Sequence, residues 1–144
     1  MPDLHVRRLR PGAQLPRRSH PGDAGFDLIA LDALEIPPGG RGAVGTGLAV
    51  AVPAGWAGLV MPRSGLARTH GVTVANAPGV VDSGYRGEVI VVLANHGVDA
   101  FQVEAGQRVA QLVLTPVATG DVCEVAQLPD SDGRGGDGFG STGR

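Results

Sequence analysis

The residues best suited to chemistry lie within residues 79–88. The carboxylate Asp82 follows two valines there and precedes a Ser-Gly turn, and the same stretch holds Tyr85, the chain's one tyrosine, and ends in Arg-Gly-Glu. A carboxylate at a turn can accept a proton from a water molecule, as general-base hydrolysis requires. Asp82 could instead be an ordinary surface residue that hydrogen-bonds its own backbone, and the stretch taken alone favours that interpretation.

A second set of residues is suited to binding phosphate. Residues 62–71 are the best helix candidate in the chain, because Ser64 can cap the N-terminus and Gly71 can end the helix. The start of a helix carries backbone N–H groups that bind anions, and Arg63 stands directly before it. The alternative is an ordinary capped helix with a solvated arginine, and this segment alone does not decide between the two.

The basic residues are all arginines, since the 12 Lys and Arg residues include no lysine. This excludes a lysine-dependent P-loop, a Schiff-base mechanism and a Ser-Lys dyad. Any anion that the protein holds by side-chain charge must therefore be held mainly by arginine, whose planar fork matches phosphate oxygens.

The glycine-rich residues 129–144 cannot bury a core of their own, so we expect a flexible tail. Yet the segment carries Arg134 and Phe139, followed by a Gly-Ser-Thr-Gly sequence. Backbone N–H groups of such a sequence can surround phosphate, and an aromatic ring can stack on a base. Composition alone favours a simple mobile tail, and the alternative is a lid that becomes ordered over a nucleotide.

The composition indicates one globular domain of 144 residues with 42% hydrophobic and 18% charged residues. A net charge of −2 argues against a broad nucleic-acid interface. No apolar run approaches the roughly 20 residues that span a bilayer, and the N-terminus lacks the apolar segment of a secretion signal. With a single cysteine and scattered histidines, we expect a cytoplasmic protein without a structural zinc site.

The elements that must position these residues are short strands. The 24 glycines and 11 prolines leave few segments long enough for an ordinary helix, which favours an all-β sandwich or barrel. We predict one hairpin joined at residues 53–55. We predict another between the strand-like residues 71–75 and 89–93, with Asp82 and Tyr85 near its tip. Residues 88–95 are nearly all apolar, so we expect that strand to be buried on both faces. The predicted strands are 4–9, 23–30, 43–52, 56–61, 71–75, 88–95, 98–104, 107–117 and 121–128.

Together these segments resemble the trimeric deoxyuridine triphosphatase (dUTPase) family. The five motifs of that family have counterparts in the usual order, and the resemblance spans nearly the whole chain. One difference from the family pattern is Asp137, where glycine is usual. The matching segments are residues 24–28, 62–67, 79–88, 106–112 and 134–143.

The resemblance implies an all-β jelly-roll barrel or sandwich with one short helix and a flexible C-terminal tail. It implies a jelly-roll domain over residues 1–128 and a lid over residues 129–144. The implied reaction converts dUTP and water to dUMP and pyrophosphate, which keeps uracil out of DNA and supplies dUMP for thymidylate synthesis. The implied assembly is a homotrimer whose subunits share sites, with no nucleic acid or membrane as partner.

The resemblance also implies the catalytic roles. Asp82 would activate the water that attacks the α-phosphorus, and Gln111 would lie near the α-phosphate. Mg²⁺ would be held by triphosphate oxygens and waters, with Asp27 touching those waters. The residues expected to bind the phosphates are Arg63, Ser64, Gly65, Arg134, Gly140, Ser141 and Thr142.

Selection of the base and sugar would fall to other residues of the same motifs. The main chain of Val80, Val81 and Ile90, helped by Asn76, would complement the pairing edge of uracil. Cytosine would leave buried groups unpaired there. Tyr85 would pack beneath the deoxyribose and leave no room for a 2′-hydroxyl, and Phe139 would cover the uracil.

Two alternatives share this fold. A dCTP deaminase needs a catalytic glutamate beside the base, and the apolar residues 89–93 supply none. A non-catalytic regulator that binds dUTP is the other alternative, and the presence of Asp82 argues against it.

Overall fold

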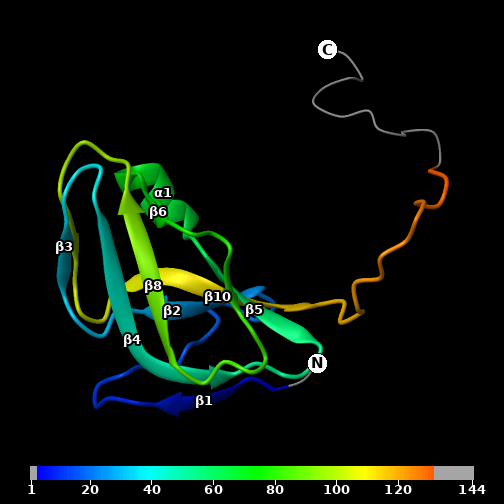
Figure 1. The fold of residues 1–144 in the computed structure, drawn as a ribbon. Coiled ribbons are helices and arrows are strands. Elements are labelled where there is room, and N and C mark those ends of the chain that lie inside the picture. The colour runs from blue at the N-terminus through cyan, green and yellow to red at the C-terminus, as the bar shows by residue number, and fades with distance from the viewer. Residues whose placement is uncertain (1–2, 132–144) are drawn as a thin grey trace.

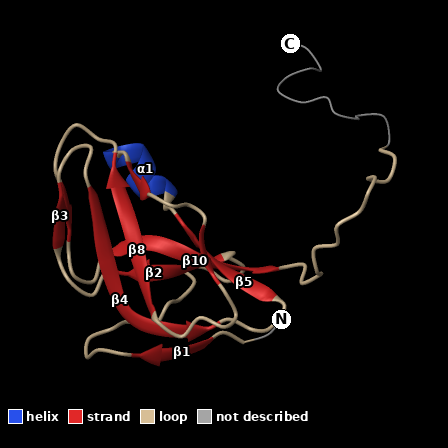
Figure 2. Ribbon diagram, viewed as in Figure 1, coloured by secondary structure: helices blue, strands red, loops and turns tan. Residues whose placement is uncertain are grey.

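The computed structural model describes residues 3–131, which form ten strands and one short helix (Figures 1 and 2). Helix α1 has seven residues, and no helix in this part of the chain is long and apolar enough to cross a bilayer. The elements are β1 (His5–Arg8), β2 (Gly25–Ile29), β3 (Leu34–Ile36), β4 (Arg41–Ala51), β5 (Trp56–Met61), α1 (Ser64–His70), β6 (Val72–Val74), β7 (Gly79–Val81), β8 (Glu88–Asn95), β9 (Phe101–Val103) and β10 (Arg108–Pro116).

The strands form two four-stranded sheets and a separate pair. One sheet has the order β1-β4-β8-β6, the other has the order β2-β10-β5-β7, and β3 pairs with β9. Every named pair of strands is antiparallel. The arrangement is a jelly-roll sandwich rather than a closed barrel, and it confirms the predicted all-β class with one short helix.

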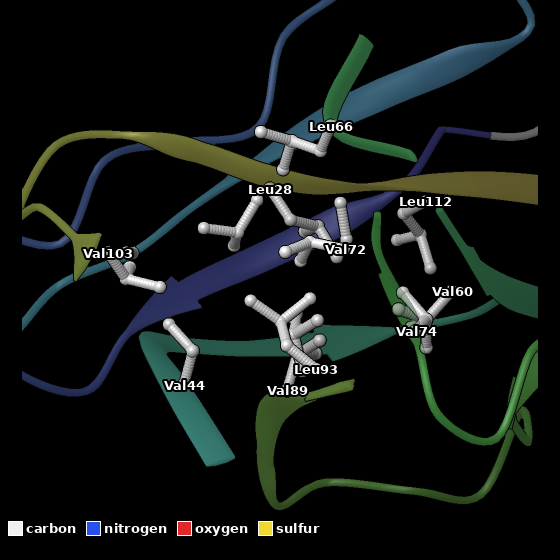
Figure 3. Packing of buried hydrophobic residues seen from close by; sticks show 14 of the residues in the cluster. Leu28, Val44, Val60, Leu66, Val72, Val74, Val89, Leu93, Val103 and Leu112 are labelled. Carbon is white, nitrogen blue, oxygen red and sulfur yellow. The ribbon is translucent and has the colours of Figure 1, made fainter. Parts of the chain in front are cut away.

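Alternating strand residues build the core, as expected for sheets with one covered face (Figure 3). Leu28 of β2 and Leu112 of β10 meet Val44 of β4 and Leu93 of β8, and all four are at most 2% exposed. Leu66 of α1 also belongs to this cluster. Burial of each such side chain contributes on the order of 1.5–3 kcal/mol, so the core holds the two sheets together.

The predicted hairpin joined at residues 53–55 is wrong, because that connection crosses between sheets. Strand β4 pairs with β1 and β8, whereas β5 pairs with β10 and β7. The second predicted hairpin is confirmed in its two strands, because β6 pairs with β8 in antiparallel register. Its connection is not a simple turn, since residues 79–81 form β7, which was not predicted and pairs with β5 in the other sheet. A turn signal cannot distinguish a hairpin from a crossing, since both need the same tight turn. Asp82 and Tyr85 therefore lie on a connection between the two sheets.

The strand expected at residues 121–128 is absent, and the three-residue strand β3 was not predicted. After β10 the described chain runs away from the sandwich, with Val122 fully exposed (Figure 1). A strand needs a partner, and no strand among residues 3–131 pairs with residues 121–128. The prediction that β8 is buried on both faces is also wrong, because Ile90 is 51% exposed while Val89 and Val91 are buried.

Candidate functional site

A pocket of about 270 Å³ lies where β7, the turn after it and β8 meet. The sequence prediction named six of its lining residues, and the structure brings these six together from residues 76–90. Four further lining residues were not predicted: Val60, Gly79, Glu88 and Val89. The six predicted residues are Asn76, Val80, Val81, Asp82, Tyr85 and Ile90.

The turn between β7 and β8 holds Asp82 at the edge of this pocket. The backbone N–H of Tyr85 donates to the carbonyl of Asp82 at 3.1 Å, which closes the turn. Nη1 of Arg86 donates to the carbonyls of Ser83 and Tyr85, both at 2.7 Å. The turn is thus braced from two sides, and the exposed Asp82 carboxylate is accessible to water and ligand.

The walls of the pocket suit a flat, partly apolar ligand. Val80 is 60% exposed and faces the same pocket as the half-exposed Ile90, whereas Val81 is buried. Strand β7 is the edge of its sheet, so only one of its sides is paired with β5. An edge strand presents unpaired N–H and C=O groups, which can hydrogen-bond a ligand that lies alongside.

A second cluster forms around Asp27 of β2, and we call it the arginine–aspartate cluster: Ser19, Asp27, Arg63 and Arg108. Oδ1 of Asp27 lies 3.5 Å from Nε of Arg63, and Oδ2 lies 3.3 Å from Nη1 of Arg108. Oγ of Ser19 donates to Oδ2 of Asp27 at 2.9 Å. The Asp27 side chain is only 16% exposed, so two cations balance a largely covered carboxylate.

Three adjacent strands bring this cluster together. Gln111 of β10 lies opposite Asp27 of β2 on one side and Met61 of β5 on the other. Its Nε2 donates to the carbonyl of Pro62 at 3.0 Å, which fixes the segment leading into α1. The predicted residues Asp27, Arg63 and Gln111 are therefore neighbours. Ser19 and Arg108 were not predicted, although Arg108 belongs to the 106–112 motif and its charge was a signal for it.

Helix α1 begins one residue earlier than the predicted cap at Ser64 requires. Arg63 occupies the N-cap position, with an extended backbone and no side-chain cap hydrogen bond, so the prediction of Ser64 as N-cap is wrong. Ser64 is already the first helical residue, and both it and Gly65 are exposed. The predicted end is confirmed, because Gly71 is the C-cap with φ of 69°.

The two groups of residues stay apart within the chain. The lining of the pocket does not include Asp27, Arg63, Ser64, Gly65 or Gln111. The remaining predicted residues lie outside the described part of the chain. They are Arg134, Phe139, Gly140, Ser141 and Thr142.

The described residues offer no ready cage for a metal ion. Among residues 3–131 no group of three or more His, Cys, Asp or Glu side chains is placed to hold one. Asp27 stands as a single carboxylate beside two arginines. A single carboxylate of this kind fits contact with the water ligands of a hydrated Mg²⁺, whose other ligands would be phosphate oxygens.

The fold is a jelly roll that carries a pocket at the free edge of β7 and, apart from that pocket, a cluster of two arginines around Asp27. A sequence profile of the dUTPase family matches residues 12–143. The deoxyuridine 5′-triphosphate nucleotidohydrolase of Wolinella succinogenes is 48% identical over 141 residues, covering 98% of this chain and 94% of that protein. The chain therefore belongs to the dUTPase family.

Solved structures agree with this assignment. A mutant dUTPase of Staphylococcus bacteriophage 80alpha with dUpNHpp superposes with a TM-score of 0.93 at 26% identity, covering 100% of both chains. A mutant dUTPase from phage phi11 of S. aureus, described with a structural Mg(II) ion, has a TM-score of 0.81 at 25% identity. It covers 88% of this chain and 98% of its own.

Proposed function

We infer that the protein hydrolyses dUTP to dUMP and pyrophosphate. The observation that carries this inference is the pocket itself: in a chain of the dUTPase family, an exposed carboxylate, Asp82, stands at the edge of a cavity beside an unpaired strand edge. By this reaction the protein would keep uracil out of DNA and supply dUMP for thymidylate synthesis.

We propose that uracil lies against the free edge of β7. Uracil presents an acceptor, a donor and an acceptor along its pairing edge, and main-chain groups of Val80 and Val81 can complement that order. Ile90 and Val80 supply apolar contact to the ring, and Asn76 adds an amide within the same pocket. Cytosine reverses two of these positions and would leave main-chain groups unpaired in the closed site, which is a large penalty.

Asp82 is the proposed general base. A water molecule bound to its carboxylate attacks the α-phosphorus, the new P–O bond forms as the bond to the bridging oxygen breaks, and pyrophosphate leaves. The proton of the water passes to Asp82. The exposure of Asp82 and its fixed position on the braced turn support this role.

The phosphate chain needs cations that the pocket itself lacks. We propose that the arginine–aspartate cluster of one subunit faces the pocket of another in a homotrimer, and that the tail of a subunit closes the site with Arg134 and Phe139. The separation of the two groups within one chain supports a shared site. The exposed apolar residues of the segment that leaves the sandwich also support an assembly. They are Val117, Val122, Val125 and Leu128.

We propose Mg²⁺ as the cofactor, with Asp27 in contact with its waters. The ion would neutralise triphosphate charge, and Asp27 would orient its hydration shell while Arg63 binds phosphate oxygens. Within the same proposal the protein is cytoplasmic, since its single cysteine, Cys123, is unpaired, as is usual in a reducing compartment.

Glu88 bears on the deaminase alternative, because this carboxylate lines the pocket. Its Oε1 accepts a hydrogen bond from the backbone N–H of Gly47 at 2.7 Å. A side chain held by β4 in this way is poorly placed to move protons on a base, so hydrolysis remains the better assignment.

The experiment measures release of pyrophosphate and ammonia from dUTP and dCTP. We expect pyrophosphate from dUTP and no ammonia from either nucleotide. Asp82→Asn should lower kcat by about 10²–10⁴-fold, because it removes the base but keeps the shape. It should still bind dUTP, whereas Asp99→Asn, which changes an exposed carboxylate outside the pocket, should leave kcat unchanged. Undiminished turnover in Asp82→Asn would show that Asp82 is not the general base.

A further inference from the structure

The ring of Tyr85 lies directly against Gly87. A Cβ atom placed on Gly87 would lie 2.5 Å from Oη and 2.7 Å from Cζ of Tyr85. Both separations are shorter than a real Cβ contact. Glycine at position 87 is therefore required for the Tyr85 ring to occupy its observed position. The backbone does not impose this choice, because φ of Gly87 lies outside the left-handed region.

The far end of the ring is fixed as well. Oη of Tyr85 donates to the carbonyl of Glu88 at 2.8 Å. The Glu88 side chain in turn accepts from the N–H of Gly47, which has a positive φ of 68°. Gly47 lies where the pairing of β4 with β8 shifts register. A continuous set of contacts therefore runs from the irregular part of β4 to the tyrosine ring at the pocket.

We propose that Gly87 is a specificity-determining positioning residue, which sets the place of the Tyr85 ring and thereby the selection of deoxyribose over ribose. The proposal rests on the function proposed above, to which it adds the family-based expectation that Tyr85 packs beneath the sugar. It adds that the ring excludes a 2′-hydroxyl only because Gly87 and the Glu88 carbonyl hold it in one position.

The physical reason is the small difference between the two sugars. UTP differs from dUTP by one hydroxyl group, so a pocket rejects it only if a rigid group occupies the space beside C2′. A Cβ on Gly87 closes the space beneath the ring, while the 44% exposure of Tyr85 leaves an open path toward solvent. The ring would then move outward, lose its hydrogen bond to Glu88 and leave room for the extra hydroxyl.

The test compares Gly87→Ala with Gly84→Ala, a matched control in the same turn where a Cβ meets nothing within 4 Å. We expect the ratio of kcat/KM for dUTP to kcat/KM for UTP to fall at least about tenfold in Gly87→Ala and to stay within about twofold in Gly84→Ala. Tyr85 is the one tyrosine of the chain, so protein labelled with ¹³C-tyrosine gives a single set of ring signals. Those signals should shift in Gly87→Ala and not in Gly84→Ala.

The outcomes separate this proposal from the function on which it rests. Unchanged ring signals, or shifted signals with an unchanged dUTP/UTP ratio, would overturn the role of Gly87 while dUTP hydrolysis stands. If wild-type protein does not hydrolyse dUTP, the proposed function fails, and the ring signals still test the packing. If Gly87→Ala does not fold, Tyr85→Phe removes the hydrogen bond to Glu88 alone; a lowered ratio then supports the proposal and an unchanged ratio overturns it.

Discussion

Nε of Arg63 lies 3.5 Å from Oδ1 of Asp27, which ties the residue before α1 to strand β2. Nη1 of the same arginine donates to the carbonyl of Arg108 at 3.1 Å. Arg108 also contacts the other carboxylate oxygen of Asp27. Asp27 therefore keeps one cationic partner when Arg63 turns toward a phosphate, which allows Arg63 to exchange partners without leaving a covered carboxylate unpaired.

Replacing Asp27 with Asn should affect the use of Mg²⁺ more than stability. The substitution keeps the shape of the side chain but removes the charge that faces the arginines and the proposed hydrated ion. We expect the Mg²⁺ concentration for half-maximal activity to rise about tenfold, with a stability loss of at most about 1 kcal/mol, since Arg108 is half exposed. Titrations of activity with Mg²⁺ and urea unfolding measure the two effects.

The matched control is Asp32→Asn, which breaks another Asp–Arg pair. Oδ2 of Asp32 lies 2.7 Å from Nη1 of Arg10, and both side chains are exposed. This substitution should leave the Mg²⁺ dependence unchanged. An equal effect of both substitutions would show that Asp27 acts through general charge and not through the site.

Gly71 should tolerate alanine poorly because two effects add. Its φ of 69° is strained for an L-residue, and a Cβ there would lie 2.8 Å from the backbone nitrogen of Gly97. Gly55 has a similar φ of 78° but open space around it. We expect Gly55→Ala to cost about 1 kcal/mol of unfolding free energy and Gly71→Ala about 2–3 kcal/mol, because the second also displaces backbone. Urea unfolding of both variants would give the difference, and equal losses would show that the contact with Gly97 relaxes freely.

Local patterns predicted the elements of this fold better than their partners. Alternation of apolar residues located β1 and β10, apolar runs bounded by turn residues located β2 and β5, and Gly71 marked the end of α1 correctly. The pairing of β6 with β8 was predicted, but the partners of β5 and β7 could not be predicted from the turns, because the connections after β4 and after β7 cross between sheets. The strand expected at residues 121–128 failed for a related reason: its apolar residues are exposed, and none of the strands in the described part of the chain pairs with it.

In the candidate site, too, residues close in sequence were predicted and contacts between distant strands were not. Residues 79–88 are close in sequence, so the pocket around Asp82 follows from one motif. The pairing of Gln111 with Asp27 depends on the register of β10 against β2, and that register includes a shift between Arg108 and Ala110. Such a shift leaves no clear mark in the alternation of residues, which is why Arg108 was not predicted as a partner of Asp27. Ser19 lies in a loop that reaches Asp27 through the isolated bridge between Arg17 and Asp27, and no local pattern indicates that bridge.

A chain that ends at Leu128 should keep its fold but lose most of its turnover. None of the described residues after β10 belongs to a strand, so removal of residues 129–144 leaves the sandwich and its core unchanged. Loss of the proposed contacts from Arg134 and Phe139 should lower kcat by about a hundredfold or more, which is typical when charge-stabilising groups are removed from a site. Steady-state kinetics, with circular dichroism and sizing as controls, measure this. An unchanged rate in the truncated protein would rule out the lid.

Two inactive variants should restore activity to each other if subunits share the site. Asp82→Asn disables the pocket, and Arg63→Gln disables the arginine–aspartate cluster, so each variant alone should be nearly inactive. In a trimer that contains both kinds of subunit, one of the three sites combines an intact pocket with an intact cluster from its neighbour. Random mixing of equal amounts makes about three quarters of the trimers mixed, so unfolding and refolding the variants together should recover about a quarter of the wild-type activity. Variants that are refolded separately and then combined should stay inactive if the trimers do not exchange subunits. No recovery after joint refolding, with mixed trimers verified by mass spectrometry, would show that Asp82 and Arg63 of the same chain serve one site.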